Sequence, residues 1–205
     1  MRNKFGNLLI FLGAALMISA LVLFLFNQQQ AQSAQQAASD LMEQLVKELE
    51  DVEEPTIAEE YIGLPLEYMD PAVFEMTEVE IDGHAYIGYL SIPTLGLELP
   101  VMSEWSYEKL RIAPCRYYGT VMGEDLVVMA HNYRSHFARI YKLREGDLVS
   151  FVDMDGVLTE YQVTAYEVLP PDSVEEVIAG NADLTLFTCT YAGSNRVIVY
   201  CDEIN

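Results

Sequence analysis

The sequence has few basic residues. Its 205 residues include 11 Lys and Arg against 32 Asp and Glu, which gives a formal net charge of -21. This balance argues against a nucleic-acid-binding protein, because phosphate recognition needs a basic surface. The same excess of carboxylates predicts repulsion from anionic lipids and cell-wall polymers.

Cysteine is also scarce. The three cysteines include no Cys-x-x-Cys pair, which excludes a disulfide scaffold and a zinc knuckle and leaves at least one thiol free. Neither a Gly-rich phosphate loop, a dinucleotide-binding fingerprint nor an internal repeat is present. Apolar residues make up 51% of the chain and charged residues 21%, a composition typical of globular rather than disordered proteins.

One long hydrophobic run lies near the N-terminus. Leu8–Phe26 contains 19 residues without a charge, enough to cross about 28 Å of hydrocarbon as a helix. Arg2 and Lys4 precede the run, so the positive-inside rule predicts a cytoplasmic N-terminus and an exported remainder. The alternative is a cleaved signal peptide with small residues at 31–34, but the run exceeds the about 7 to 15 residues of a signal-peptide core.

A stalk is expected after the hydrophobic run. Residues 27–40 are rich in Gln and Ala, and a helix-favouring segment follows until Pro55. Leucines at positions 41, 45 and 49 share one helical face, which could pack on the following domain or on a partner; we favour a solvated spacer. The predicted organisation is an anchor at 1–26, a stalk at 27–60 and an extracellular catalytic domain at 61–205.

The last 120 or so residues alternate short β-branched and aromatic runs with turn residues, a pattern that predicts a mostly β domain closed into a barrel. Short helices are expected near Tyr107–Ile112 and Val174–Ala179. Several turn signals separate the runs, among them Asp155-Gly156. The predicted strands are His84–Ile92, Leu97–Val101, Leu126–His131, Asp147–Asp153, Glu160–Val168, Leu184–Cys189 and Arg196–Asp202.

Residues suited to nucleophilic chemistry lie at strand ends. His131 and Cys189 each end a hydrophobic strand, where a polar side chain can face a cleft. A hairpin would place Arg196 opposite Cys189, and Cys201 opposite Leu184 at the far end, too distant for a disulfide with Cys189. The alternatives are a buried structural cysteine, a hydrogen-bonded structural histidine and a solvated arginine.

Three motifs resemble those of sortases, the membrane-anchored cysteine transpeptidases of Gram-positive bacteria. Thr185-Leu-Phe-Thr-Cys189 is similar to their Thr-Leu-x-Thr-Cys signature, Val127-Val-Met-Ala-His131 to the strand that ends in their active-site His, and Arg196-Val-Ile-Val-Tyr200 to the strand that begins with their essential Arg. The resemblance extends over residues 84–203. It implies an eight-stranded sortase-like β-barrel behind an N-terminal transmembrane helix and helical stalk. Two further segments are similar, Tyr89–Gly96 and Phe137–Phe151.

The resemblance also implies roles for individual residues. Cys189 would be the nucleophile, His131 the general acid and base, and Arg196 the partner of substrate and oxyanion. These residue types suit acyl transfer, because a thiolate attacks carbonyl carbon, an imidazole moves protons near neutral pH, and a guanidinium stays charged. Thr188, Asn132 and Tyr191 are the residues that we assign to substrate binding.

The implied reaction is cleavage of a sorting motif similar to Leu-Pro-x-Thr-Gly. The Cys thioester would pass its acyl group to an amine of a cell-wall precursor or of a pilin lysine. Two alternatives remain: another exported cysteine peptidase or hydrolase at the cell wall, and a barrel that binds peptides without catalysis. L,D-transpeptidases typically carry Ser-x-Gly-Cys at the nucleophile, and Phe187-Thr-Cys189 lacks that glycine.

No cofactor is expected. Some sortases bind calcium with acidic loops, and such a site could be formed here by Asp172, Glu175 and Glu176. We favour a solvated acidic loop, because these carboxylates do not follow a calcium-loop pattern. The short segment between the strands ending at Val168 and beginning at Leu184 also argues against the long helical insertion of class B sortases, and the class stays open.

Overall fold

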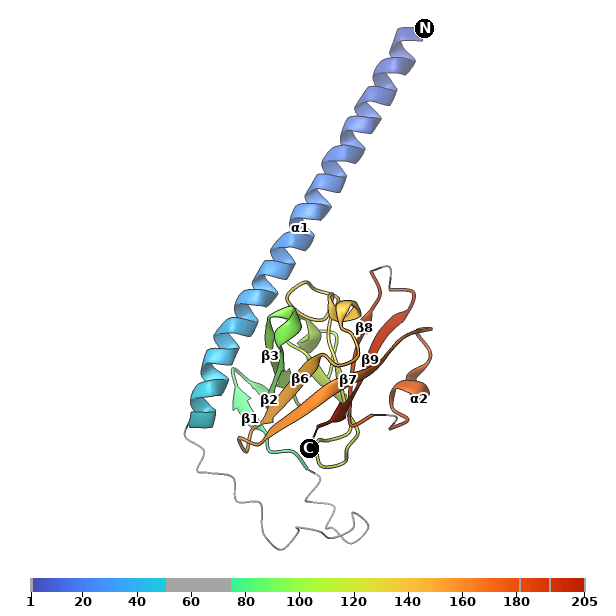
Figure 1. Cartoon of the computed structure of the whole chain (residues 1–205). Helices are drawn as coiled ribbons and strands as arrows, with labels where there is room; N and C mark the ends of the chain where they lie inside the picture. Colours follow the sequence, from blue (N-terminus) through green and yellow to red (C-terminus); the bar gives the residue numbers. More distant parts are fainter. Residues whose placement is uncertain (1, 51–74, 181, 192, 205) are drawn as a thin grey trace, which may run out of the picture.

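The structure is a computed structural model that describes residues 2–50, 75–180, 182–191 and 193–204. A single long helix, α1 (Arg2–Glu50), leans against a β-barrel and projects well beyond it at its N-terminal end (Figure 1). The predicted boundary between stalk and catalytic domain, at residues 60 and 61, lies outside the described residues.

Helix α1 has two different halves. Its segment Ile10–Gln29 is long and apolar enough to cross a membrane, and none of it is buried in the protein. Further along, Leu41 and Leu45 are buried in a cluster that includes Tyr86 and Met102 of the barrel. The interpretation of this half as a solvated spacer is therefore wrong: leucines four residues apart share one face, and that face packs on the domain.

The barrel is built from short strands and a few single turns of helix. Its short helices are η4 (Pro93–Leu95), η5 (Lys109–Arg111), η6 (Ile140–Lys142) and α2 (Val174–Val177). Its strands are β1 (Val79–Ile81), β2 (His84–Ile92), β3 (Leu97–Met102), β4 (Cys115–Tyr118), β5 (Leu126–Met129), β6 (Leu148–Asp153), β7 (Leu158–Leu169), β8 (Leu184–Cys189) and β9 (Arg196–Glu203).

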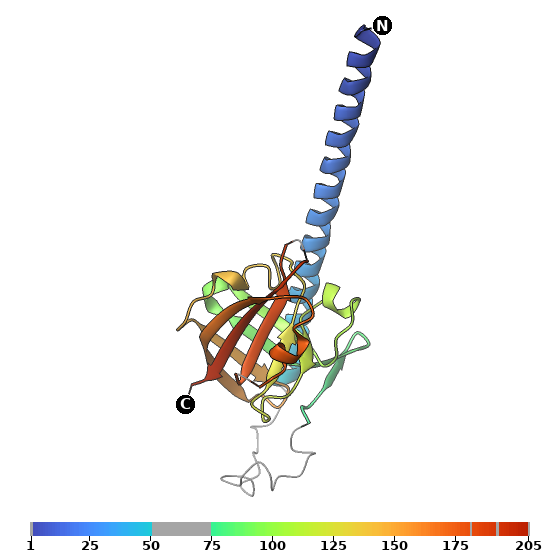
Figure 2. The same cartoon turned by 90° about the vertical axis from the view of Figure 1, so that its right-hand side faces the viewer.

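Eight of these strands form a closed ring, which confirms the predicted barrel (Figure 2). The order is β2-β3-β4-β5-β8-β9-β7-β6, and pairing of β2 with β6 closes it. β1 pairs only with β2 and lies outside the ring. Two pairs of neighbouring strands run parallel, β3 with β4 and β5 with β8. The parallel β5–β8 pair matters most, because it brings together two strand ends that are far apart in sequence.

The closing seam depends on a glycine. Gly88 of β2 pairs with Asp153 of β6 and has a φ of 144°, a conformation that favours glycine. A Cβ at this position would clash with the carbonyl oxygen of Val152. The backbones of β2 and β6 therefore approach each other closely where the ring closes.

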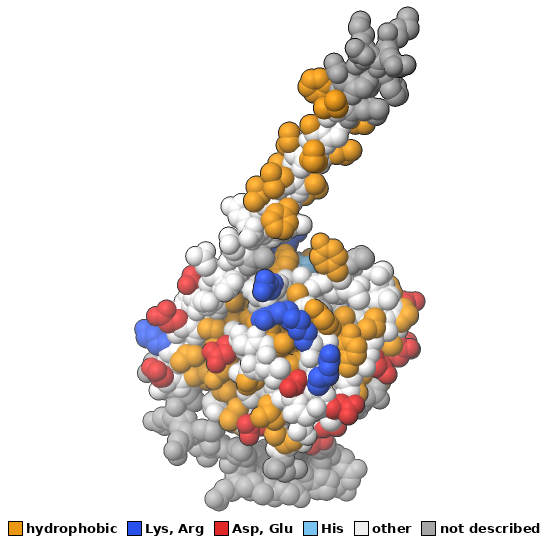
Figure 3. Space-filling view, turned by 45° about the horizontal axis from the view of Figure 1, so that its top comes forward, with side chains coloured by type: hydrophobic (Ala, Val, Ile, Leu, Met, Phe, Trp, Pro, Cys, Tyr) orange, Lys and Arg blue, Asp and Glu red, His pale blue; other side chains and the backbone are white. Residues whose placement is uncertain are grey.

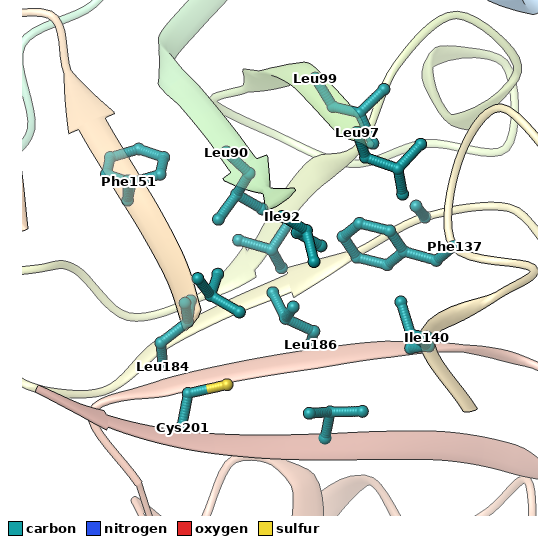
Figure 4. Packing of buried hydrophobic residues seen from close by; sticks show 14 of the residues in the cluster. Leu90, Ile92, Leu97, Leu99, Phe137, Ile140, Phe151, Leu184, Leu186 and Cys201 are labelled. Carbon is teal, nitrogen blue, oxygen red and sulfur yellow. The ribbon is translucent and has the colours of Figure 1, made fainter. Parts of the chain in front are cut away.

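Side chains from every wall fill the barrel interior. Alternate residues of β8, Leu184 and Leu186, point inward, and Cys201 of β9 meets them from the next strand (Figure 4). Phe137 from the connection after β5 packs into the same cluster and is fully buried. A second cluster, which includes Phe187 and residues of α2 and β9, covers the outer face of β5, β8 and β9. Strand alternation thus separates an inner and an outer apolar surface.

Candidate active site

The β8–β9 hairpin pairs Cys189 with Arg196. Cys189 is the last residue of β8 and Arg196 the first of β9, and the two are Cα partners in the antiparallel register. The connecting loop is closed by the bond from Thr190 N to Asn195 O (2.9 Å). Cys201 pairs with Leu184 at the other end of the ladder, as expected, and all three cysteines are free.

His131 arrives from the neighbouring strand. β5 runs parallel to β8, with Met129 paired to Phe187, and the ladder continues through the bond from Ala130 N to Phe187 O (3.2 Å). His131 follows Ala130 by one residue, and Cys189 follows Phe187 by two. The structure therefore brings His131, Cys189 and Arg196 to the same end of the adjacent strands β5, β8 and β9.

Alternation along these strands shows which way the three residues face. Val128 of β5, Leu186 of β8 and Val199 of β9 belong to the interior cluster, whereas their outward neighbours belong to the outer cluster. Successive side chains of a strand point to opposite faces, and Cys189, His131 and Arg196 are each an even number of residues from an outward-facing neighbour. The three polar side chains therefore point outward. They therefore converge at the rim on the outer side of the barrel, where a substrate can approach. Their outward neighbours are Val127, Phe187 and Ile198.

Thr188 has a different role from the predicted substrate contact. Its side chain is 3% exposed, and its hydroxyl donates a hydrogen bond to the carbonyl oxygen of Ala130 (2.7 Å). This bond ties the end of β8 to the end of β5, directly beside Cys189 and His131. Burial corrects the sequence interpretation: Thr188 faces inward and positions the strand ends, so its side chain is not available to a substrate.

Cys189 is the accessible thiol of the chain. It is half-buried, whereas Cys115 and Cys201 are fully buried. Burial raises the pKa of the Cys115 thiol to about 12 and that of Cys201 further still. A thiol must ionise to act as a nucleophile. Of the three cysteines, Cys189 is therefore the one suited to chemistry.

The His131 ring is held among other side chains. Partial burial lowers the pKa of His131, and the positive charge of Arg111 lowers it further. The ring of Tyr133 lies 4.8 Å from that of His131, and Tyr133 in turn contacts the ring of His136 at 5.4 Å. A lowered pKa favours neutral imidazole at neutral pH, the form that can accept a proton.

His136 lies behind this group and is fully buried. Within the described residues neither ring nitrogen has a partner in hydrogen-bond geometry, although a weaker contact with the Ile112 backbone acts to raise its pKa. Burial lowers its pKa to about 4, and the charge of His131 contributes in the same direction. His136 is therefore neutral at neutral pH and packs as an aromatic ring.

The Arg196 guanidinium is anchored to its own loop. Its Nη1 donates hydrogen bonds to the carbonyl oxygens of Gly193 and Asn195, both at 3.2 Å. The side chain is thus fixed at the mouth of the hairpin, in the register position opposite Cys189. A guanidinium held in this way can donate further hydrogen bonds to an oxyanion.

Asn132 and Tyr191 lie on the side of the site that faces α1. Both line a cavity of about 1030 Å³ between the helix and the barrel. The Tyr191 side chain is fully exposed and Asn132 is half-buried. The structure places them beside the three candidate catalytic residues but not among them.

An aromatic row on the outer face was missed from the sequence. The ring of Tyr117 lies 5.2 Å from that of Phe187, Trp105 lies 5.7 Å from Tyr117, and Tyr107 lies 5.8 Å from Trp105. Trp105 and Tyr117 also line a cavity of about 760 Å³. The row starts two residues before Cys189 but is assembled from separate segments. Only the single tryptophan of the chain could have drawn attention to it.

The acidic segment around α2 was the candidate position for a calcium site. Among the described residues, no group of three or more His, Cys, Asp or Glu side chains is arranged to hold a metal ion. The assignment of Asp172, Glu175 and Glu176 to a solvated acidic loop stays a prediction.

Comparisons with known proteins agree with this geometry. Residues 90–204 match the sequence model of the sortase domain. Sortase A from Bacillus anthracis is 33% identical over 143 residues, which cover 65% of this chain and 67% of the relative.

Solved structures give the same result. Sortase C1 from Streptococcus suis is 27% identical with a TM-score of 0.53, covering 60% of this chain and 74% of that one. Clostridium perfringens sortase C, solved with the C-terminal cell wall sorting motif, is 26% identical with a TM-score of 0.54, covering 64% and 74%. Because the domain match spans more than half of the chain and includes all three strand ends of the site, this protein belongs to the sortase family of cysteine transpeptidases.

Proposed function

We propose that this protein is a sortase-type transpeptidase that cleaves a C-terminal sorting motif similar to Leu-Pro-x-Thr-Gly and transfers the acyl part to an amine. The observation that carries the proposal is the convergence of Cys189, His131 and Arg196 at the ends of β5, β8 and β9. Membership of the sortase family supports the same chemistry.

The first half-reaction forms a thioester. His131 accepts the proton of the Cys189 thiol, and the sulfur attacks the carbonyl carbon of the motif's Thr residue. Negative charge develops on the carbonyl oxygen, and Arg196 donates hydrogen bonds to it without giving up a proton. The C–N bond then breaks, and His131 returns the proton to the departing amine.

The second half-reaction releases the product. An incoming amine attacks the thioester carbon, and neutral His131 takes its proton as the new amide forms. The C–S bond breaks and the Cys189 sulfur leaves as thiolate. Water competes with the amine, so transfer requires that the site hold the amine close to the thioester.

The surface beside the site supports binding of an extended apolar peptide. The aromatic row of Phe187, Tyr117, Trp105 and Tyr107 leads away from Cys189 along the outer face. Tyr107 is 72% exposed and Trp105 40% exposed, so a peptide can reach these rings. Asn132 and Tyr191, on the side of α1, are proposed to contact the substrate from the opposite direction.

The acceptor is an amine of a cell-wall precursor peptide or of a pilin lysine. The chemistry of the thioester accepts either amine, so the amine offered in the experiment below distinguishes them.

The chain is also proposed to be anchored in the cell membrane by α1. Arg2 and Lys4 precede the apolar segment, which favours a single-pass orientation with a cytoplasmic N-terminus and an extracellular barrel. The division into anchor (1–26), stalk (27–60) and catalytic domain (61–205) belongs to this proposal. Protease treatment of intact cells tests it: the barrel should be digested, and an N-terminal tag should survive.

The central experiment follows the acyl group. The full chain in detergent is mixed with fluorescent peptides that carry variants of the sorting motif and with an amine such as triglycine, and Cys189 is examined by mass spectrometry. We expect an acyl adduct on Cys189 that disappears as the amine-linked product forms.

Two variants serve as comparison. Cys189→Ala should abolish the adduct and the product. Cys115→Ala should retain both, because Cys115 is fully buried. An adduct that decays only to free acid would indicate a hydrolase, and failure of every peptide while a thiol reagent still labels Cys189 would contradict the proposed substrate class.

A further inference from the structure

Positive charge is concentrated in one segment of this acidic protein. Residues 130–144 contain Arg134, Arg139, Lys142 and Arg144 and no Asp or Glu, in a chain with a net charge of -21. Arg134, Lys142 and Arg144 are exposed. The ion pairs seen among the described residues, Lys109–Glu104 and Arg116–Glu78, use none of these four cations. The segment is thus a basic surface without internal compensation, which we call the basic face.

The basic face lies at the end of the barrel from which α1 projects. Figure 1 and Figure 2 both show the connection after β5, which contains η6, at this end. Figure 3, in which this end comes forward, shows Lys and Arg side chains gathered at the foot of the helix, with acidic side chains mostly farther out. The net charge of the chain predicts repulsion from anionic surfaces, but the charge distribution reverses that expectation here.

This end of the barrel reaches the level of the apolar segment of α1. Arg134 and Arg139 line the same cavity of about 1030 Å³ as Phe24 and Gln28 of the helix. Both helix residues lie within Ile10–Gln29, the segment long enough to span a membrane. Phe24 precedes the end of that segment by only about 7 Å of helical rise. The apolar run itself ends at Phe26, and Asn27 to Gln29 are polar, so if α1 spans the bilayer the cavity lies where the hydrocarbon core meets the headgroup layer.

The remaining lining of this region suits an interfacial position. Tyr191 lines the cavity with its side chain fully exposed, and Tyr141, beside Lys142, is 50% exposed. Tyrosine is enriched where a membrane meets water, because its ring is apolar and its hydroxyl is polar. Polar side chains of the helix, among them Gln32 and Gln35, complete the wall opposite the arginines.

We propose that the basic face and the adjoining cavity bind the anionic headgroups of phospholipids, so that the barrel rests on the membrane surface with its active-site end toward the lipid. The inference rests on the proposed anchoring of α1 and is independent of the transpeptidase reaction. Guanidinium and ammonium groups pair with lipid phosphates, and Arg139 is held toward the cavity by its hydrogen bond to the carbonyl oxygen of Leu95 (2.7 Å).

Carboxylates near the basic face do not cancel it. Glu98 lines the cavity, and Glu145 and Asp147 follow the segment. The Asp147 carboxylate accepts hydrogen bonds from the hydroxyl of Thr94 (2.9 Å) and the backbone N–H of Arg144 (2.8 Å), which are neutral donors and leave its charge in place. The balance is four cations, those of the basic face, against these three carboxylates, so it remains positive by one charge.

The test measures how close position 191 lies to lipid headgroups. Full-length Cys189→Ala protein with Tyr191→Cys is labelled with an environment-sensitive fluorophore; the other two cysteines are fully buried and do not compete. It is reconstituted into nanodiscs of phosphatidylcholine, with or without phosphatidylglycerol, that carry a headgroup nitroxide quencher. We expect at least about twofold stronger quenching with phosphatidylglycerol, and loss of that difference in about 0.5 M salt.

Matched variants assign the effect to the basic face. Arg134→Gln with Lys142→Gln should reduce quenching to the phosphatidylcholine level. Lys109→Gln with Arg116→Gln removes the same charge from η5 and β4, outside the basic face, and should leave quenching unchanged. A fluorophore at Leu158→Cys, exposed at the β6–β7 turn, should stay unquenched in both lipids.

Two results would overturn the proposal in distinguishable ways. Equal quenching in both lipids, with the protein recovered in the nanodisc fraction, would refute docking and leave the anchor intact. Failure of the protein to enter nanodiscs would refute the anchor, and the docking inference with it.

Discussion

Cys189 and Arg196 lie directly opposite each other across the β8–β9 ladder, one ending its strand and the other beginning its strand. The loop between them is short and is closed by the bond from Thr190 N to Asn195 O, so one hairpin presents both the thiol and the guanidinium. At Arg196 the contribution of the planar guanidinium can therefore be separated from the contribution of its positive charge.

Arg196→Lys should lower kcat/KM by about 10² to 10³, because an ammonium keeps the charge but loses the planar fork that can hold the loop and an oxyanion together. Peptide transfer is measured with thermal unfolding as the check on folding. Lys109→Gln, which changes a charge elsewhere, should keep full activity. Equal kcat/KM in the lysine variant would mean that charge alone is sufficient.

Activity should depend on pH through His131. Its pKa is lowered by burial and by the charge of Arg111, so in the free enzyme His131 becomes protonated only below its ordinary pKa. As pH falls through that value the base is lost, and kcat/KM should fall with it. Arg111→Gln removes one cause of the lowered pKa, so the acid limb should move to higher pH.

Lys109→Gln is the matched control for this experiment, because Lys109 lies in the same turn of helix, η5. The pH dependence of kcat/KM and the NMR titration of the His131 ring provide two measurements. An acid limb that stays in place while the ring titration moves would show that another group limits the rate.

Acid stability should depend on His136. Its pKa is about 4 in the folded protein and about 6.5 when unfolded, so the unfolded chain binds the proton more tightly. The contribution to stability is complete above about pH 6.5 and is lost as pH falls toward 4, by about 3 kcal/mol in total. Phenylalanine takes up no proton, so His136→Phe should lose less stability than the wild type on acidification. The free energy of unfolding of the variant minus that of the wild type should therefore be larger at pH 4 to 5 than at pH 8.

Chemical denaturation at several pH values measures this effect. His84→Gln, at the half-buried start of β2, supplies the control histidine. If the phenylalanine variant retains the full acid sensitivity of the wild type, the sensitivity must come from other groups.

Thr188 should stabilise the site through its hydroxyl. Thr188→Val leaves the carbonyl oxygen of Ala130 without its 2.7 Å partner in a buried position, at an expected cost of about 1 to 3 kcal/mol. Thr188→Ser retains the donor and should lose much less. The free energies of unfolding of the two variants, from urea titration, decide between a hydrogen-bonding role and simple packing.

Contact between α1 and the barrel should depend on Leu45. Leu45 is fully buried between helix and barrel, so Leu45→Ala should cost about 2 to 5 kcal/mol of packing free energy. Hydrogen exchange over 41–49 should accelerate in the full chain. Val46→Ala, next along the helix and 41% exposed, should change exchange little. Similar exchange in both variants would indicate that the helix does not pack there in solution.

Much of the fold could be predicted because its signals are local. β2 and β8 have the predicted ends, and the hairpin register correctly placed Arg196 opposite Cys189 and Cys201 opposite Leu184. Period-two alternation in strong β-forming residues is visible without knowledge of neighbours. β1 and β4, with three and four residues, were not among the predicted strands, whereas β5, also of four residues, was predicted because it lies in a longer hydrophobic run.

The apolar N-terminal run, the ends of β2 and β8 and the three sortase motifs were thus determined by the sequence itself, because each depends on residues close together in the chain. The tertiary structure alone decided which strands are neighbours, that Thr188 is buried, and that the leucine face of α1 packs on the barrel. It also assembled the aromatic row and set the basic face beside the helix. These features arise from contacts between distant segments, which hydrophobic burial selects only once the whole barrel has closed.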